Sequence, residues 1–164
     1  MRSIACTMLM LVAVSNSPTL MAQLKTTAHC PPFEVDILDG KVNGFKPDRT
    51  QGEIAGRFPC FTMKEDESGR CGGLLAYKDK DIYFYTGRHY VEIGPKFKGK
   101  LSIPVMGSRR GGLFRTLGNP KIRETNWDAW QTNYGCLILY YGADSKVKKI
   151  QFSTYGTDAI KLCE

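Results

Sequence analysis

The sequence has little histidine and no residue arrangement that is typical of a metal or catalytic site. Its 164 residues include only two histidines, His29 and His89, and no Cys-x-x-Cys pair. Zinc sites and nucleophile–base pairs both depend on such residues. We therefore expect no metal, no cofactor and no enzymatic activity, and the absences favour a binding protein.

The sequence also lacks a hydrophobic run long enough to span a bilayer. Its main apolar run, 4–14, follows Arg2 and is succeeded by a polar stretch that ends in Leu-Met-Ala at Ala22. A positive start, a short apolar segment and a small residue before the cleavage point are typical of a secretory signal peptide. We predict a signal peptide over residues 1–22, a single domain over residues 23–164, and a secreted, extracellular protein with no membrane span.

Six cysteines are present, and the first of them, Cys6, lies in the predicted signal peptide. In an oxidising compartment, an odd set of five predicts two disulfides and one unpaired thiol. Spacing alone does not decide which cysteines pair. The five are Cys30, Cys60, Cys71, Cys136 and Cys163.

Short β-rich runs alternate with turn residues along most of the chain, whereas no segment of ten or more residues has a convincing helical repeat. A turn or two of helix fits only within 47–57, where Gly52 and Gly56 weaken it. The candidate strands are 58–63, 72–78, 81–86, 89–93, 99–105, 113–117, 126–132, 136–141 and 148–154.

These strands predict an all-β fold, a single antiparallel up-and-down β-barrel of about eight strands, with a sandwich as the alternative. The run 136–141 is apolar on both faces, so it must be covered on both sides. In 148–154, we expect Lys149, Gln151 and Ser153 to face solvent and their neighbours to face the core.

The segment 128–141 resembles the Thr-Asp-Tyr segment of secreted lipocalins, where that tripeptide opens a late barrel strand. Here the tripeptide is Thr132-Asn133-Tyr134, and a hydrophobic strand follows it. The runs 99–103 and 148–155 resemble the middle and last strands of the same barrel. The lipocalin Gly-x-Trp of the first strand has no match, and Phe58 stands in its place after Gly56.

The cysteine placement resembles that of arthropod salivary lipocalins similar to nitrophorins and triabin. The resemblance implies that Cys30 pairs with Cys136 and Cys71 with Cys163, which leaves Cys60 unpaired. It also implies a secreted carrier that sequesters a small hydrophobic or amine ligand in the barrel. Inward-facing aromatic side chains would bind that ligand, and our candidates are Tyr83, Tyr85, Trp130, Tyr134 and Tyr140.

The charge distribution supports an alternative function. The chain carries a formal net charge of +7, and residues 88–123 contain nine Lys or Arg and one acid, Glu92. Such a surface attracts an acidic protein or a glycosaminoglycan, whereas no nucleic-acid motif is present. The alternative is a triabin-like inhibitor or effector without a ligand cavity that binds a protein through basic loops. Its candidate residues are Lys96, Lys98, Lys100, Arg109, Arg110 and Arg115.

Overall fold

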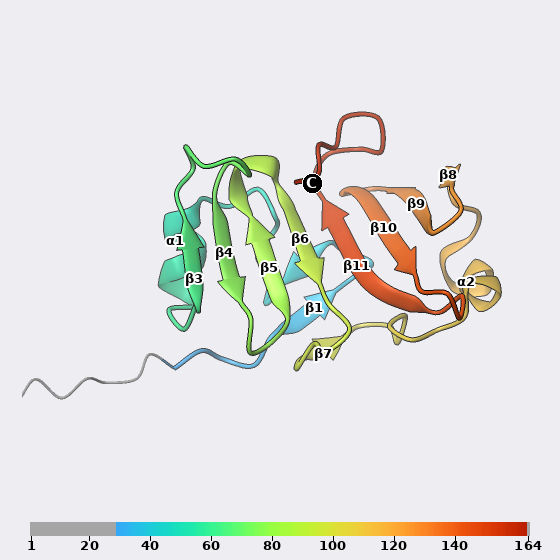
Figure 1. The fold of residues 1–164 in the computed structure, drawn as a ribbon, viewed down its shortest axis with the longest axis horizontal. Coiled ribbons are helices and arrows are strands. Elements are labelled where there is room, and N and C mark those ends of the chain that lie inside the picture. The colour runs from blue at the N-terminus through green and yellow to red at the C-terminus, as the bar shows by residue number, and fades with distance from the viewer. Residues whose placement is uncertain (1–28, 164) are drawn as a thin grey trace, which may run out of the picture.

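A computed structural model describes residues 29–163, so the predicted signal peptide lies outside the described residues. Within them, the chain forms an all-β domain around one large antiparallel sheet, as predicted (Figure 1). No helix in this part of the chain is both long and apolar enough to cross a membrane. The sheet strands are β3 (Met63–Glu65), β4 (Leu74–Tyr77), β5 (Ile82–Tyr85), β6 (Tyr90–Ile93), β8 (Ile122–Arg123), β9 (Trp127–Thr132), β10 (Gly135–Tyr141) and β11 (Val147–Ser153).

The strand order differs from that of an up-and-down barrel. It runs β3-β4-β5-β6-β11-β10-β9-β8, so two four-stranded meanders meet where β6 pairs with β11. The cause lies in residues 94–121, which leave the sheet after β6 and bring the chain back at the far edge, in β8. The described sheet therefore ends at β3 on one side and at β8 on the other.

A second layer covers the inner face of this sheet. It contains a small sheet of β1 (Glu34–Asp36), β2 (Lys41–Val42) and β7 (Lys100–Leu101), in which β7 runs parallel to β1. The helices α1 (Gln51–Arg57) and α2 (Arg110–Leu117) complete the layer, and a short 3-10 turn, Thr86–Arg88, links β5 to β6. Val35, Ile54 and Leu113 bring β1, α1 and α2 into the same core as the large sheet.

The two helices can be compared with what the sequence predicted for their segments. The expected helical turns within 47–57 are present as α1, where Thr50 accepts a bond from the Glu53 amide and Glu53 bonds back to the Thr50 amide. This capping box offsets the cost of the two glycines. The expected strand at 113–117 was wrong, because that segment is α2. Leu113 and Leu117 stand four residues apart and both meet the core, which is a helical spacing.

Strand β10 is covered on both faces, as its sequence required. Leu137 and Leu139 enter the main core, whereas Cys136 and Ile138 belong to a second cluster on the outer face. Residues of the C-terminal tail, 154–163, pack against that second cluster. The outer face of the sheet is thus partly an interior surface.

Because the outer face is partly covered, our expectation that three polar residues of β11 face solvent was wrong for two of them. Lys149 is half exposed, but Gln151 and Ser153 are buried. Gln151 donates to Glu92 at 2.6 Å, and the Ser153 hydroxyl donates to the His89 carbonyl at 2.7 Å. These bonds allow polar side chains to be buried on a face that alternation alone assigns to water.

The disulfides are Cys30–Cys60 and Cys71–Cys163. The pairing of Cys71 with Cys163 agrees with the expectation, but the pairing of Cys30 with Cys136 was wrong, and Cys60 is not the unpaired residue. The reason is that Cys30 and Cys60 pack against the main core, whereas Cys136 lies in the outer cluster on the opposite face of the sheet. Cys136 is therefore the unpaired cysteine among residues 29–163.

The Cys136 thiol is predicted to resist alkylation in the folded protein. It is fully buried, and burial raises its pKa to about 11, so the reactive thiolate is scarce at neutral pH. Iodoacetamide followed by non-reducing peptide mapping should find Cys136 unmodified in native protein and modified after denaturation. Rapid native labelling of Cys136, or labelling of Cys60, would contradict the arrangement.

Candidate functional site

The five aromatic residues predicted to bind a ligand do not line one cavity. Trp130 and Tyr134 contact the main core, and Tyr140 contacts the outer cluster. Tyr83 and Tyr85 alternate along β5 with the core residues Ile82 and Phe84, so they lie on the outer face. The sheet thus divides the five residues between its two faces.

The polar atoms of these aromatic residues are engaged within the fold. Trp130 donates to the Gly118 carbonyl at 3.1 Å, and the Tyr134 hydroxyl donates to the Ile37 carbonyl at 2.9 Å. Burial raises the pKa of Tyr134 well above its ordinary value, which keeps this donor protonated. On the outer face, the Tyr85 ring stacks on Tyr90 with centroids 4.3 Å apart.

Aromatic rings also fill the centre of the main core. Phe33, Phe58, Tyr77 and Phe84 form a continuous set, with ring centroids between 4.9 and 6.4 Å apart. The Tyr77 hydroxyl is satisfied by the Phe58 carbonyl at 2.7 Å. In this part of the molecule the aromatic content supplies packing, which favours a function carried by the surface.

The predicted basic residues fall into two separate groups. Lys96, Lys98 and Lys100 lie on the loop after β6 and on β7, near the bottom centre of Figure 1, while the three arginines lie in and beside α2 at its right-hand edge. Lys100 shares a surface hollow with Lys41 and with the acids Glu34, Asp36 and Asp39. The structure therefore does not form one continuous basic stripe.

Arg110 is used inside the fold. Its Nε atom lies 3.0 Å from a carboxylate oxygen of Asp128, and its Nη2 atom bonds the other oxygen. Asp128 is only 2% exposed and also accepts from the Tyr141 hydroxyl at 2.8 Å. The hydrogen bond to Asp128 raises the pKa of Arg110. This ion pair attaches the start of α2 to β9, so Arg110 offers little charge to a partner.

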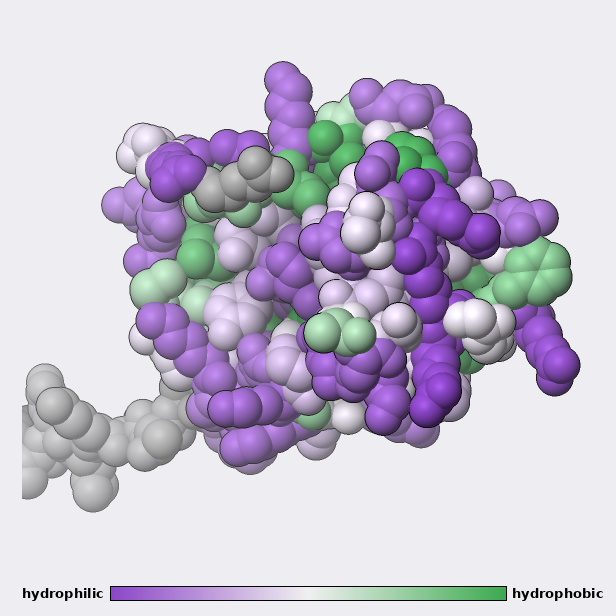
Figure 2. Space-filling model, turned by 45° about the vertical axis from the view of Figure 1, so that its right-hand side comes forward, coloured by the Kyte–Doolittle hydropathy of each residue, from purple (hydrophilic) through white to green (hydrophobic). Residues whose placement is uncertain are grey.

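Two exposed arginines and an exposed aromatic ring lie on α2 and at its N-terminal end. Arg109 and Arg115 are exposed and form no salt bridge within residues 29–163, while Phe114 is 54% exposed. Residues 109–123 contain five Lys or Arg and no acid. Figure 2 brings this side of the molecule forward and shows hydrophilic side chains over most of it. We call Arg109, Phe114 and Arg115 the α2 surface.

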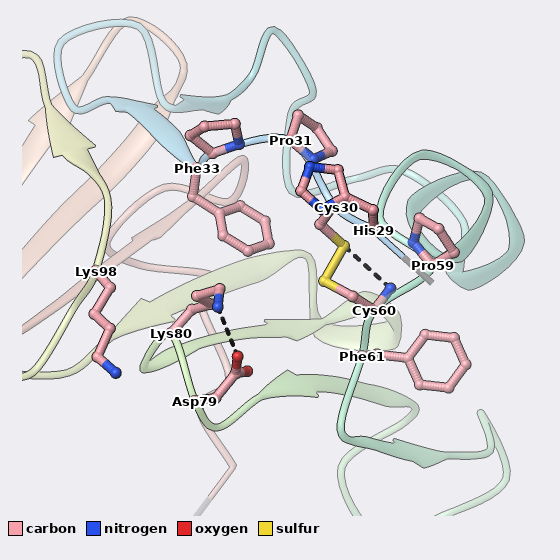
Figure 3. Close-up of a pocket in the computed structure, with 11 residues that line it drawn as sticks. His29, Cys30, Pro31, Phe33, Pro59, Cys60, Phe61, Asp79, Lys80 and Lys98 are labelled. Carbon is pink, nitrogen blue, oxygen red and sulfur yellow. Dashed lines mark hydrogen bonds and ion pairs between the residues drawn. A yellow bond between two sulfur atoms is a disulfide. The ribbon is translucent and has the colours of Figure 1, made fainter. Parts of the chain in front are cut away.

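A second hollow surrounds the Cys30–Cys60 disulfide (Figure 3). Its apolar side includes Pro31, Pro59 and Phe61, and the Cys60 amide bonds Cys30 Sγ at 3.0 Å. Its other side carries Lys98 and the ion pair of Lys80 with Asp79 at 2.7 Å. Of the residues that the sequence selected, this hollow includes only Lys98 and none of the aromatic residues.

Two important residues escaped the sequence analysis. Asp128 was not singled out, because nothing in a lone acid beside an apolar strand shows that an arginine eighteen positions away will reach it. Phe114 was not singled out either, because it lies in 113–117, which was expected to be a strand. The signal that could have found it is local, since Phe114 directly precedes Arg115 and follows Arg109-Arg110-Gly111-Gly112.

Comparisons with protein-family models, with curated proteins and with solved structures find no match to this chain. The argument for function therefore rests on the residues themselves. Among residues 29–163, no group of three or more potential metal ligands comes together.

Proposed function

We propose that this protein is an extracellular binding protein that attaches to an acidic protein surface through the α2 surface. The observation that carries the proposal is that Phe114 and Arg115 on α2, and Arg109 at its N-terminal end, are all exposed, and that neither arginine forms a salt bridge within residues 29–163. On the same helix, Leu113 is only 4% exposed and anchors α2 to the core. The helix therefore holds its outward residues on a fixed base.

The chemistry of these residues fits a protein partner. Arginine and aromatic side chains are enriched in the buried centres of protein interfaces, where the ring fills a pocket and the guanidinium pairs with carboxylates. A glycosaminoglycan would use the arginines but would gain little from Phe114. The exposed ring thus favours an acidic protein over a sulfated polysaccharide.

The filled core favours this function over the carrier hypothesis, in which a small hydrophobic or amine ligand lies inside a barrel. Four aromatic rings occupy the centre of the interior. Two disulfides support an extracellular location, because such bonds persist in oxidising compartments. Secretion through the signal peptide at 1–22 remains part of the proposal.

Selection from a random peptide library displayed on phage tests the proposal. The wild-type protein should select peptides that combine several carboxylates with one large apolar residue. Their affinity should fall about tenfold or more for Arg109→Glu/Arg115→Glu, because each reversal replaces attraction with repulsion. Raising the salt concentration should weaken binding, since exposed charges are screened over roughly 8–10 Å.

Two controls separate the alternatives. The variant Lys96→Glu/Lys98→Glu makes an equal charge change away from α2 and should leave peptide affinity within about twofold of wild type. The variant Phe114→Ser should weaken peptide binding but not heparin binding. Selection of neutral peptides, or equal losses from both charge reversals, would refute the proposal. Heparin binding that depends on the arginines without any acidic peptide ligand would identify a polysaccharide partner instead.

A further inference from the structure

We infer that a hollow beneath the C-terminal tail binds a small uncharged ligand that has an aromatic or branched apolar body. This site lies on the outer face of the large sheet, away from the α2 surface. It encloses about 260 Å³. We call it the tail pocket, and its lining residues are Ile122, Trp127, Ala129, Ile138, Tyr140, Thr157, Ile160 and Leu162.

The strand register builds the floor of the tail pocket. Ile122, Ala129 and Ile138 are direct partners across β8, β9 and β10, so they form one row on the same face. Trp127 and Tyr140 form the next row, with ring centroids 6.4 Å apart. A small alanine between two isoleucines leaves a depression bordered by two aromatic rings.

The roof is the tail itself, and both of its ends are anchored. Near the start, the Thr157 amide and hydroxyl both bond Gln131 Oε1, at 3.1 and 3.0 Å, and Asp158 pairs with Lys121 at 2.8 Å. At the end, Cys163 is tied to Cys71. These attachments hold the tail over the sheet as a fixed cover.

A second group of bonds fixes the tail near its end. Arg88 donates to the Leu162 carbonyl at 3.0 Å and to the Lys161 carbonyl at 3.4 Å. The Cys163 amide donates to the Tyr90 hydroxyl at 3.1 Å. Ile160 and Leu162 therefore lie above the floor without filling the space below them. Figure 2 shows strongly apolar side chains at the top of the molecule, at the height of the tail in Figure 1.

The lining residues keep apolar surface that the fold does not bury. Ala129 and Ile138 are buried, but Trp127, Tyr140, Ile160 and Leu162 are only half-buried although they pack against the same cluster. An apolar ligand would remove this surface from water, which is the main source of affinity in such pockets. The enclosed volume suits a molecule of one or two fused rings.

The charges at the rim favour a neutral ligand. Lys149 lies 4.2 Å over the Tyr140 ring and 3.4 Å from Glu92, so its charge is already balanced. Lys121 is likewise paired with Asp158. Neither cation is left to recruit an anion into the pocket.

Titration with 2-naphthol and with naphthalene, followed by amide and indole NMR shifts, tests the inference. The Trp127 indole and the amides of Ile138 and Ile160 should shift together.

Two filling variants approach the pocket from opposite sides. Ala129→Leu from the floor and Ile160→Phe from the roof should each weaken 2-naphthol binding about tenfold or more. If the buried Ala129 change disrupts folding, the tail change still provides the test. Phe114→Ser is the matched control and should leave 2-naphthol affinity unchanged.

Specific outcomes would overturn the inference. Unchanged affinity in Ile160→Phe, or shifts that gather around the Cys30–Cys60 hollow, would refute the tail pocket. Peptide binding by the α2 surface is measured in a separate experiment. A failure of the tail pocket can therefore be distinguished from a failure of the proposed function.

Discussion

Replacing Arg110 with methionine is expected to lower the free energy of unfolding by about 3–5 kcal/mol. The substitution keeps the apolar stem but leaves the Asp128 carboxylate, 2% exposed, with the Tyr141 hydroxyl as its remaining close donor. The next cation, Arg123, lies 3.9 Å away and is largely exposed. A buried charge without its partner is among the most destabilising changes known in proteins. Urea unfolding followed by circular dichroism measures the loss.

The double variant Arg110→Met/Asp128→Leu separates the cost of an unpaired charge from the value of the pair. It should recover most of the lost stability, because an apolar pair of similar volume leaves no buried charge. Arg115→Met, an exposed arginine on the same helix, should change stability by less than about 0.5 kcal/mol. Equal losses from Arg110→Met and Arg115→Met would contradict the structural role of Arg110.

Removal of the Cys71–Cys163 disulfide is expected to cost about 4–5 kcal/mol. The two cysteines are 92 residues apart, so the bond restricts a large part of the unfolded chain. The double variant Cys71→Ser/Cys163→Ser removes this restriction without leaving an unpaired thiol. It also releases the end of the tail, so 2-naphthol affinity should fall together with stability. Thermal and urea unfolding measure the first effect, and NMR titration the second.

The Cys30–Cys60 disulfide provides the matched comparison. Its cysteines are 30 residues apart, and its removal should cost about 3–4 kcal/mol while leaving 2-naphthol affinity unchanged. A loss of affinity in both disulfide variants would mean that global destabilisation, and not release of the tail, is responsible. No loss of stability in Cys71→Ser/Cys163→Ser would mean that this pairing does not form.

Two features agree with what the lipocalin resemblance implied, namely the hydrophobic strand after Tyr134 and the bond between Cys71 and Cys163. The bond between Cys30 and Cys60, and the pairing of β6 with β11, depart from it.

Sequence alone determined the features that arise from neighbouring residues. Alternating β-rich runs and turn residues predicted strands β4, β5, β6, β9, β10 and β11 close to their observed bounds, because pleat and turn chemistry are local. The doubly apolar run 136–141 predicted a strand covered on both sides. The charge count located the basic segment that contains α2.

Only the tertiary structure decided which distant residues meet. It placed Cys136 across the sheet from Cys30. It also paired Arg110 with Asp128, so that Arg110 is not available to a partner. It also brought the tail over the outer face, where Gln151 became buried and the tail pocket formed. Such contacts depend on strand order and on long-range packing, which the period of a single strand does not encode.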